Sequence, residues 1–292
     1  YEECDHQRQS HRMSIARSIL VTGGNAGIGL ALCRQLAVDH GVRVFMGARN
    51  AKRGAVGLKS ITDAHPGATV ELLSIDVADD ASVVAAATEL RSKGVTLYAL
   101  VNNAGVGLQT GPSDVEALLN TNLRGPKRVT EAFVDLLDAT AGRIVNVSSG
   151  SASMWLRDQS ADRKTLFTSS DTTWAELEAA VAEEAVAASM GGYGLSKAAL
   201  TAYTIQIAKQ YPHLLCTSLS PGFIQTNMTS GYGARLTTEQ GTVSLLKCLF
   251  GDVTSSWYYG SDGLRSPLTV SRDPGTPEFG GEADPDASRY NN

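Results

Sequence analysis

Residues 22–29 read Thr22-Gly23-Gly24-Asn25-Ala26-Gly27-Ile28-Gly29, after an apolar β-branched run at 15–21 and before a helical pattern. A glycine-rich turn between a strand and a helix is where Rossmann-type folds bind a dinucleotide pyrophosphate. Gly23 permits the tight turn, Gly27 lets backbone amides approach the pyrophosphate, and Gly29 lets the helix pack closely on the strand. The helix N-terminus adds positive potential. The segment predicts a nucleotide-binding fold; the alternative is a turn with only a structural role.

Short apolar runs alternate with helical patterns along the chain, which is typical of consecutive βαβ units. We therefore expect one Rossmann-type α/β domain at 14–265, with a doubly wound parallel sheet of about seven strands and helices on both faces. The expected strands are 15–21, 42–46, 69–75, 97–101, 143–147, 214–219 and 257–259. The expected helices are 27–38, 51–64, 79–91, 114–137, 193–210 and 238–249.

Two terminal segments and one insertion fall outside this alternation. Residues 1–13 are polar, and we interpret them as a disordered extension. Residues 266–292 carry four prolines and several glycines, so we expect an irregular tail that either wraps around the domain or extends from it. Residues 150–190 form an insertion, with a helical stretch expected at 174–188.

Composition argues against several classes of function. The chain has 292 residues, is 42% hydrophobic, and carries a net charge of -5 without a long charged block, so no nucleic-acid surface is indicated. No apolar run approaches the roughly 20 residues that cross a bilayer. The cysteines and histidines lack the spacing of a metal site. We expect a soluble, cytoplasmic protein that acts on a small molecule and contains no metal.

The second expected strand runs into Gly47-Ala48-Arg49-Asn50, at the place where an acidic residue would bind an adenosine ribose 2′-hydroxyl. Arg49 could instead hold a 2′-phosphate through charge-assisted hydrogen bonds, with Lys52 or Arg53 adding positive potential. This favours NADPH over NADH as the cofactor. The alternative is that Arg49 is a solvated loop cation.

Two further segments lie at the carboxyl ends of expected strands, where ligands bind in open α/β sheets. One follows the third strand and the other follows the fourth, and we expect both beside the adenosine half of the cofactor. As isolated features they could equally be a helix cap and a turn. The cofactor contacts expected from these segments and from the glycine-rich turn are Gly23, Asn25, Gly27, Ile28, Gly29, Asp76, Val77, Asn103, Ala104 and Gly105.

Tyr193 and Lys197 lie four residues apart in Gly191-Gly192-Tyr193-Gly194-Leu195-Ser196-Lys197. On a helix this spacing places both side chains on one face, where the ammonium can stabilise the phenolate. The spacing alone is common in proteins. The glycine-rich turn and the Ser148-Ser149 pair give it a chemical context, and together they indicate a nicotinamide-dependent carbonyl reductase.

These motifs together resemble the short-chain dehydrogenase/reductase superfamily. The resemblance covers about residues 14–259, and its motifs occur in the family's order. They are T-G-x-x-x-G-I-G at Thr22, N-N-A-G at Asn102, Asn122, Ser149, and Y-x-x-x-K at Tyr193. Within the superfamily the chain looks most like the monomeric carbonyl reductases, a branch that includes plant salutaridine and menthone reductases.

Two features indicate this branch. The long segment between Ser149 and Tyr193 resembles the one that covers the dimerisation helix in the branch, which implies a monomer. Arg49 resembles the branch's NADPH-selecting arginine. Ala26 departs from the pattern, because relatives often carry a basic residue there that also touches the phosphate. Selectivity for NADPH could therefore be softer in this chain.

The resemblance also implies a role for each catalytic side chain. Tyr193 would be the general acid that protonates the carbonyl oxygen. Lys197, with the positive charge of the oxidised nicotinamide, would lower the pKa of Tyr193 and would bind the nicotinamide ribose. Ser149 would orient the substrate oxygen. Asn122 would hold a water leading to the lysine.

The resemblance extends to the nicotinamide end of the site. The expected contacts to the nicotinamide carboxamide are Pro221, Gly222, Ile224 and Thr226. The candidate apolar contacts to substrate, which could equally fill the core, are Met154, Trp155, Phe223 and Met228.

The sequence thus predicts NADPH-dependent reduction of a ketone, aldehyde or quinone carbonyl to the alcohol by hydride transfer. One alternative is NADP-dependent oxidation of a secondary alcohol, because direction follows cofactor ratios. The other is a non-catalytic NADP-binding regulatory protein. The identity of the substrate is not encoded in any motif that we can read.

Overall fold

The computed structural model describes residues 17–107, 114–187 and 192–281. Its centre is a single sheet in the strand order β3-β2-β1-β4-β5-β6-β7, with every neighbouring pair parallel. The strands are β1 (Ser18–Val21), β2 (Arg43–Ala48), β3 (Val70–Ser74), β4 (Ala99–Asn102), β5 (Arg143–Val147), β6 (Leu215–Leu219) and β7 (Tyr258–Tyr259). The order reverses between β1 and β4, which is the switch point where ligands bind in such sheets. The doubly wound fold predicted from the sequence is confirmed.

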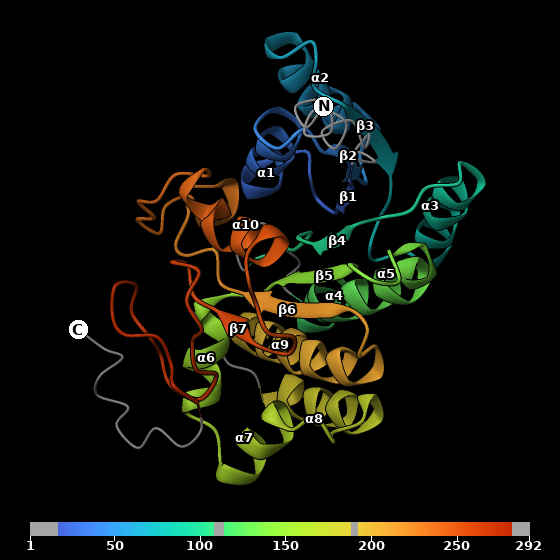
Figure 1. Cartoon of the computed structure of the whole chain (residues 1–292). Helices are drawn as coiled ribbons and strands as arrows, with labels where there is room; N and C mark the ends of the chain where they lie inside the picture. The colour runs from blue at the N-terminus through green and yellow to red at the C-terminus, as the bar shows by residue number, and fades with distance from the viewer. Residues whose placement is uncertain (1–16, 108–113, 188–191, 282–292) are drawn as a thin grey trace, which may run out of the picture.

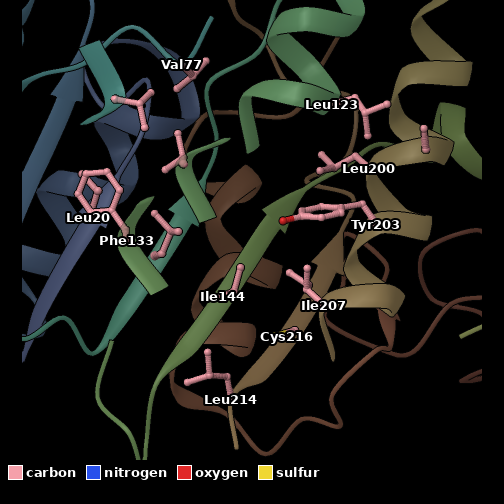
Figure 2. Packing of buried hydrophobic residues seen from close by; sticks show 14 of the residues in the cluster. Leu20, Val77, Leu123, Phe133, Ile144, Leu200, Tyr203, Ile207, Leu214 and Cys216 are labelled. Atoms are coloured by element: carbon pink, nitrogen blue, oxygen red, sulfur yellow. The ribbon is translucent and has the colours of Figure 1, made fainter. Parts of the chain in front are cut away.

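Alternate residues along each strand face opposite layers of helices, as expected for a sheet that is buried on both sides. Leu20 and Ile144 pack in one core cluster with Leu200 and Tyr203, whereas Ile19 packs in the other. Figure 2 shows the first of these clusters between the sheet and its helices. The helices that supply the first cluster include α3 (Asp80–Ser92), α5 (Gly125–Phe133) and α9 (Tyr193–Gln210). Those that supply the second include α1 (Gly27–Val38), α2 (Ala51–Ala64) and α10 (Val243–Phe250).

The insertion forms a further layer outside α9 (Figure 1). Its helices are α6 (Gly150–Arg157), α7 (Ala161–Thr168) and α8 (Trp174–Ala187). Trp174 meets the Tyr203 ring edge-on at 5.6 Å between centroids, and Asp171 pairs with Lys209 at 2.6 Å. The predicted helix at 174–188 is present as far as the described residues reach, whereas α6 and α7 have no counterpart among the predicted helices.

The prediction of a continuous helix at 114–137 is wrong because the segment is interrupted. It consists of α4 (Val115–Leu119), a π-helical turn at Asn120–Arg124, α5, and a 3₁₀ turn at Val134–Leu136. Pro126 has no N–H to donate to the carbonyl of Asn122, so the ordinary i→i−4 pattern fails there. The π-helical turn carries Asn122, one of the predicted site residues.

The other differences are small. The predicted helix at 238–249 is a short 3₁₀ turn at Gln240–Thr242 followed by α10, and most strand ends move by one to three residues. The tail, from 266 to 281, has no helix or strand and wraps onto the domain. Arg272 pairs with Asp262 at 2.8 Å, and Arg265 lies over the rings of Trp257 and Phe279. The expected extension at 1–13 and the end of the tail lie outside the described residues. In the described part of the chain, no helix is long and apolar enough to span a bilayer.

Candidate active site

A cavity of about 930 Å³ opens at the carboxyl ends of the strands, across the switch point of the sheet. It brings together eighteen of the nineteen predicted catalytic and cofactor-binding residues, from segments as far apart as residues 23 and 226. They are Gly23, Asn25, Gly27, Ile28, Gly29, Arg49, Asp76, Val77, Asn103, Ala104, Gly105, Ser149, Tyr193, Lys197, Pro221, Gly222, Ile224 and Thr226.

The glycine-rich turn has a shape that side chains would destroy. Gly23 and Gly27 have φ values of +65° and +54°, in the left-handed region that favours glycine. A Cβ on Gly29 would lie 2.4 Å from the carbonyl oxygen of Gly23, and a Cβ on Gly23 would lie 2.9 Å from the Cα of Ala104. This bare cradle at the start of α1 fits the pyrophosphate of a dinucleotide.

Asn103 lines the cavity, but its side chain is committed to holding the turn. Its Nδ2 donates to the carbonyl oxygens of Thr22, at 2.9 Å, and of Gly23, at 3.2 Å. The Thr22 hydroxyl in turn accepts the backbone N–H groups of Asn103 and Ala104, each at 3.0 Å. The two segments therefore hold each other in place. The Asn103 side chain is used in this contact and is not free to bind a ligand.

Positively charged side chains line the end of the cavity beside β2. Arg49 is exposed at the end of β2 and lines the cavity with Asn50 and Arg53, whereas Lys52 does not line it. Within the described ranges, the Arg49 side chain has neither a hydrogen bond nor an ion pair, so its five donors are available to an anion. Asn50 caps α2 by accepting the N–H of Arg53 at 2.9 Å.

Ser149 is both the N-cap of α6 and the partner of Tyr193. Its Oγ accepts the Ser151 N–H at 3.2 Å, and its hydroxyl lies near the Tyr193 hydroxyl, where it acts to lower the pKa of that phenol. The backbone donor occupies one lone pair, which leaves the Ser149 O–H and the second lone pair for Tyr193 and a ligand oxygen.

Burial raises the pKa of Tyr193, and the hydrogen bond from Ser149 opposes that shift. The direction is the opposite of the one expected from Lys197. Desolvation of the phenolate by burial is the larger of the two effects. The phenol is therefore held in its protonated form.

Lys197 reaches the same space from the next turn of α9. Its side chain is buried, and Nζ donates to the Val147 carbonyl at 2.8 Å and lies 5.8 Å from the centroid of the Tyr193 ring. Burial lowers the pKa of Lys197 to about 8. The ammonium is thus close to losing its proton within the ordinary working range of pH.

Asn122 is fully buried behind the cavity. Its Oδ1 accepts the Val106 N–H and its Nδ2 donates to the Val106 carbonyl, both at 2.9 Å. A Cβ on Gly105 would lie 3.3 Å from Asn122 Oδ1 and 3.6 Å from Lys197 Nζ, so both groups face this glycine. The neighbouring Asn120 points elsewhere and donates to the Ala78 carbonyl.

Comparison with known proteins agrees with this arrangement. A family model described as short chain dehydrogenase matches residues 17–161. A (+)-neomenthol dehydrogenase from Arabidopsis thaliana is 32% identical over 266 residues, which cover 78% of this chain and 89% of that protein. The chain belongs to the short-chain dehydrogenase/reductase family. A rat protein named carbonyl reductase [NADPH] 3 is 29% identical over 78% of this chain and 88% of its own length.

Solved structures of this oxidoreductase family share the fold over nearly their whole length. Salutaridine reductase from Papaver somniferum has a TM-score of 0.75 and 25% identity, with 83% of this chain and 99% of that chain covered. An NADPH-bound carbonyl reductase from chicken fatty liver has a TM-score of 0.63 and 27% identity, with 85% and 97% covered. The family and branch predicted from the sequence are confirmed.

The apolar wall of the cavity differs from the one predicted from the sequence. Phe223 and Met228 line the cavity, but Met154 is 53% exposed, and neither it nor Trp155 lines the cavity. Trp155 instead packs on Phe167, with ring centroids 5.1 Å apart, because its position on α6 turns it toward α7.

Sequence reasoning missed other lining residues. Val106 and Gly107 directly continue the N-N-A-G motif beyond β4, so the strand-end rule could have found them. Ser151 and Tyr232 also line the cavity. No residue pattern marks Tyr232, which lies in an irregular segment after β6.

Proposed function

We propose that this protein is an NADPH-dependent carbonyl reductase that converts a ketone, aldehyde or quinone carbonyl to the alcohol. The observation that carries the proposal is the meeting of Ser149, Tyr193 and Lys197 with the glycine-rich cradle in one cavity. The relative that bears the name carbonyl reductase [NADPH] 3 supports the same reaction class, and the names of other relatives, such as salutaridine reductase, support reduction.

The residues present fit NADPH. The bare turn at Gly23–Gly29 would hold the pyrophosphate, and Arg49, assisted by Arg53, would hold the 2′-phosphate. Pro221, Gly222, Ile224 and Thr226 would lie against the nicotinamide. When bound, NADPH supplies the hydride for the carbonyl carbon.

Tyr193 donates its proton to the carbonyl oxygen. Its raised pKa keeps the phenol protonated, which is the form that reduction requires. When the substrate is bound, Ser149 donates its single O–H to the same oxygen and so orients it, while its Oγ keeps the Ser151 amide as a donor. Both hydroxyls stabilise the negative charge that develops on the oxygen. The Lys197 ammonium stabilises the tyrosinate left after proton transfer.

We further propose that the enzyme is a monomer. The insertion helix α8 packs across α9, with Trp174 against Tyr203 and Lys127 over the Trp174 ring at 5.1 Å. This layer covers the helix face that relatives without the insertion use to dimerise. Sedimentation should give a mass close to 30.8 kDa, and twice that mass would contradict the proposal.

Loss of NADPH absorbance with a panel of quinones, aldehydes and cyclic ketones tests the reaction. Tyr193→Phe should reduce kcat by about 10²- to 10⁴-fold, the range for a general acid, while NADPH still binds. Tyr211→Phe, at the C-terminal end of the same helix and away from the cavity, is the control and should keep full activity. Undiminished reduction by Tyr193→Phe would refute the mechanism, and NADPH binding without turnover of any carbonyl would favour a regulatory protein.

A further inference from the structure

Residues 76–78 follow β3 and form one wall of the cavity, which Asp76 and Val77 line. We call them the 76–78 wall. The Asp76 carboxylate accepts the Ala78 N–H at 3.0 Å, and Ser82 Oγ accepts the Asp76 N–H at 2.9 Å. These two bonds shape the turn from within the wall and from α3, to which it leads. They do not tie the wall to the other side of the sheet's switch point.

The start of α5 approaches the 76–78 wall closely. A Cβ on Gly125 would lie 3.1 Å from the carbonyl oxygen of Val77, so the absence of a side chain lets the two backbones come together. The helices α3 and α5 also pack against each other (Figure 1). The side chain of Arg128, about one turn further along α5, therefore reaches the wall.

Arg128 donates to three acceptors around the wall. Its Nη1 donates to the Val77 carbonyl at 2.6 Å. Its Nη2 donates to Asn120 Oδ1 at 3.1 Å, and its Nε donates to Asp80 at the start of α3. The amide of Asn120 in turn donates through Nδ2 to the Ala78 carbonyl at 3.2 Å. Two successive carbonyls of the wall are thus held by one guanidinium and by the amide that it orients.

The guanidinium is well suited to this role, because its planar fork fixes the directions of its donors. The Arg128 side chain is 18% exposed, whereas that of Asp80 is 83% exposed, so the ion pair between them adds little. The bonds to the Val77 carbonyl and to Asn120 are the ones that fix the wall.

We propose that Arg128 is a positioning residue for the adenosine half of the cofactor. It holds the 76–78 wall in the shape that receives the nucleotide and does not itself line the cavity. The π-helical turn then serves both halves of the site, because Asn120 supports this wall while Asn122 faces the catalytic half. The inference rests on the proposed NADPH binding, since the wall matters only when a nucleotide lies against it.

Arg128→Met removes the guanidinium and keeps a long side chain. The Kd for NADPH should rise about tenfold, because the wall must then be ordered when the nucleotide binds. The Kd for NADH should rise by the same factor, since both cofactors contain the adenosine. Arg128→Lys keeps the charge without the fork, so its Kd values should lie between those of the other two proteins. At saturating NADPH, kcat should change by less than about twofold.

Arg91→Met is the matched control. Arg91 joins the other ends of α3 and α5, where it donates to the Asp135 carboxylate at 2.8 and 2.9 Å and to the Ala132 carbonyl at 3.4 Å. Within the part of the chain that the structure describes, it has no hydrogen bond to the 76–78 wall. This variant should leave both Kd values unchanged, even where thermal unfolding shows the same loss of stability as for Arg128→Met.

Fluorescence titration with each cofactor decides between the outcomes. If Arg128→Met does not fold, Asn120→Ala serves in its place and should raise both Kd values about threefold; unchanged values would contradict the inference. Equal Kd values for Arg128→Met and Arg91→Met would also overturn it. So would a loss confined to NADPH, which would make Arg128 an electrostatic partner of the 2′-phosphate. Failure of the unsubstituted protein to bind NADPH would instead overturn the proposed cofactor.

Discussion

The nucleotide half and the catalytic half of the cavity are built in different ways. Around β1 and β4, the main chain makes close approaches that only glycine permits, as at Gly23 and Gly29, and the side chains of Thr22 and Asn103 fix them. Around β5 to β7, the walls are held by hydroxyl side chains: Ser220 joins the insertion to the end of β6, and Ser153 joins the insertion to the tail. The walls of the nucleotide half are rigid, and their glycines can be recognised in the sequence. The walls of the catalytic half depend on side chains that other residues could replace.

The largest expected effect comes from breaking the nucleotide half at Gly29. Gly29→Ala places a Cβ 2.4 Å from the Gly23 carbonyl oxygen, which cannot move without displacing the turn. We expect the free energy of unfolding to fall by about 1–3 kcal/mol, and a similar loss in binding would raise the Kd for NADPH roughly 10- to 100-fold. Denaturant unfolding and fluorescence titration measure the two quantities.

Gly67→Ala is the control for this substitution, because nothing lies within 4 Å of its added Cβ and its φ is not left-handed. It should change neither stability nor NADPH affinity. Equal behaviour of the two variants would show that the turn tolerates side chains, and the contrast between the two halves would then fail.

A smaller effect in the same half is expected at Arg49. Arg49→Asp should weaken NADPH binding by at least about tenfold, because charge-assisted hydrogen bonds to the 2′-phosphate are lost, and should leave NADH binding nearly unchanged. Lys52→Asp makes the same change of charge at a residue that does not line the cavity. Titration of each variant with both cofactors decides the point, and equal losses for NADPH and NADH would remove Arg49 from the phosphate site.

The contrast also explains which parts of the molecule could be predicted. The bounds of α1 and α2 agree with the prediction, and the residues selected from the glycine-rich turn do line the cavity. These features follow from backbone requirements that glycine and strand-end positions reveal in one sequence. Their contacts with a cofactor remain predictions.

The catalytic half was harder to predict for physical reasons. The π-helical turn at Asn122 depends on a missing proline N–H, a local detail inside an otherwise regular helical pattern. Met154 and Trp155 were assigned to the pocket wrongly, because the phase of α6 is set by packing against α7 and α9. A serine hydroxyl such as that of Ser220 carries no signal in the sequence that separates a buried hydrogen-bonded link from a solvated surface residue.

The pH dependence of reduction examines the catalytic half directly. Below pH 8 Lys197 is protonated, and it becomes neutral as pH rises through its pKa of about 8, whereas burial keeps Tyr193 protonated. We expect kcat/KM for reduction to be constant below pH 7 and to fall about tenfold per unit above pH 8, because the neutral amine no longer stabilises the tyrosinate. Lys197→Arg keeps its charge, so this fall should disappear even if its maximal rate is lower. A profile that is flat to pH 10 in the unsubstituted enzyme would remove Lys197 as the titrating group.

The smallest expected effect concerns the link between the insertion and the π-helical turn. Arg124 of that turn donates from Nε to Glu178 of α8 at 2.7 Å, and both side chains are partly buried, with exposures of 24% and 28%. Glu178→Gln keeps the shape and removes the charge, so unfolding should become easier by about 1 kcal/mol. Because Arg124 lies two residues from Asn122, kcat should also fall by about twofold. Asp171→Asn breaks the exposed pair with Lys209, which joins the same insertion to α9, and should change neither quantity. If the two variants behave alike in unfolding and turnover, the insertion only covers α9; if Glu178→Gln alone lowers kcat, the insertion also helps to position the active site through the π-helical turn.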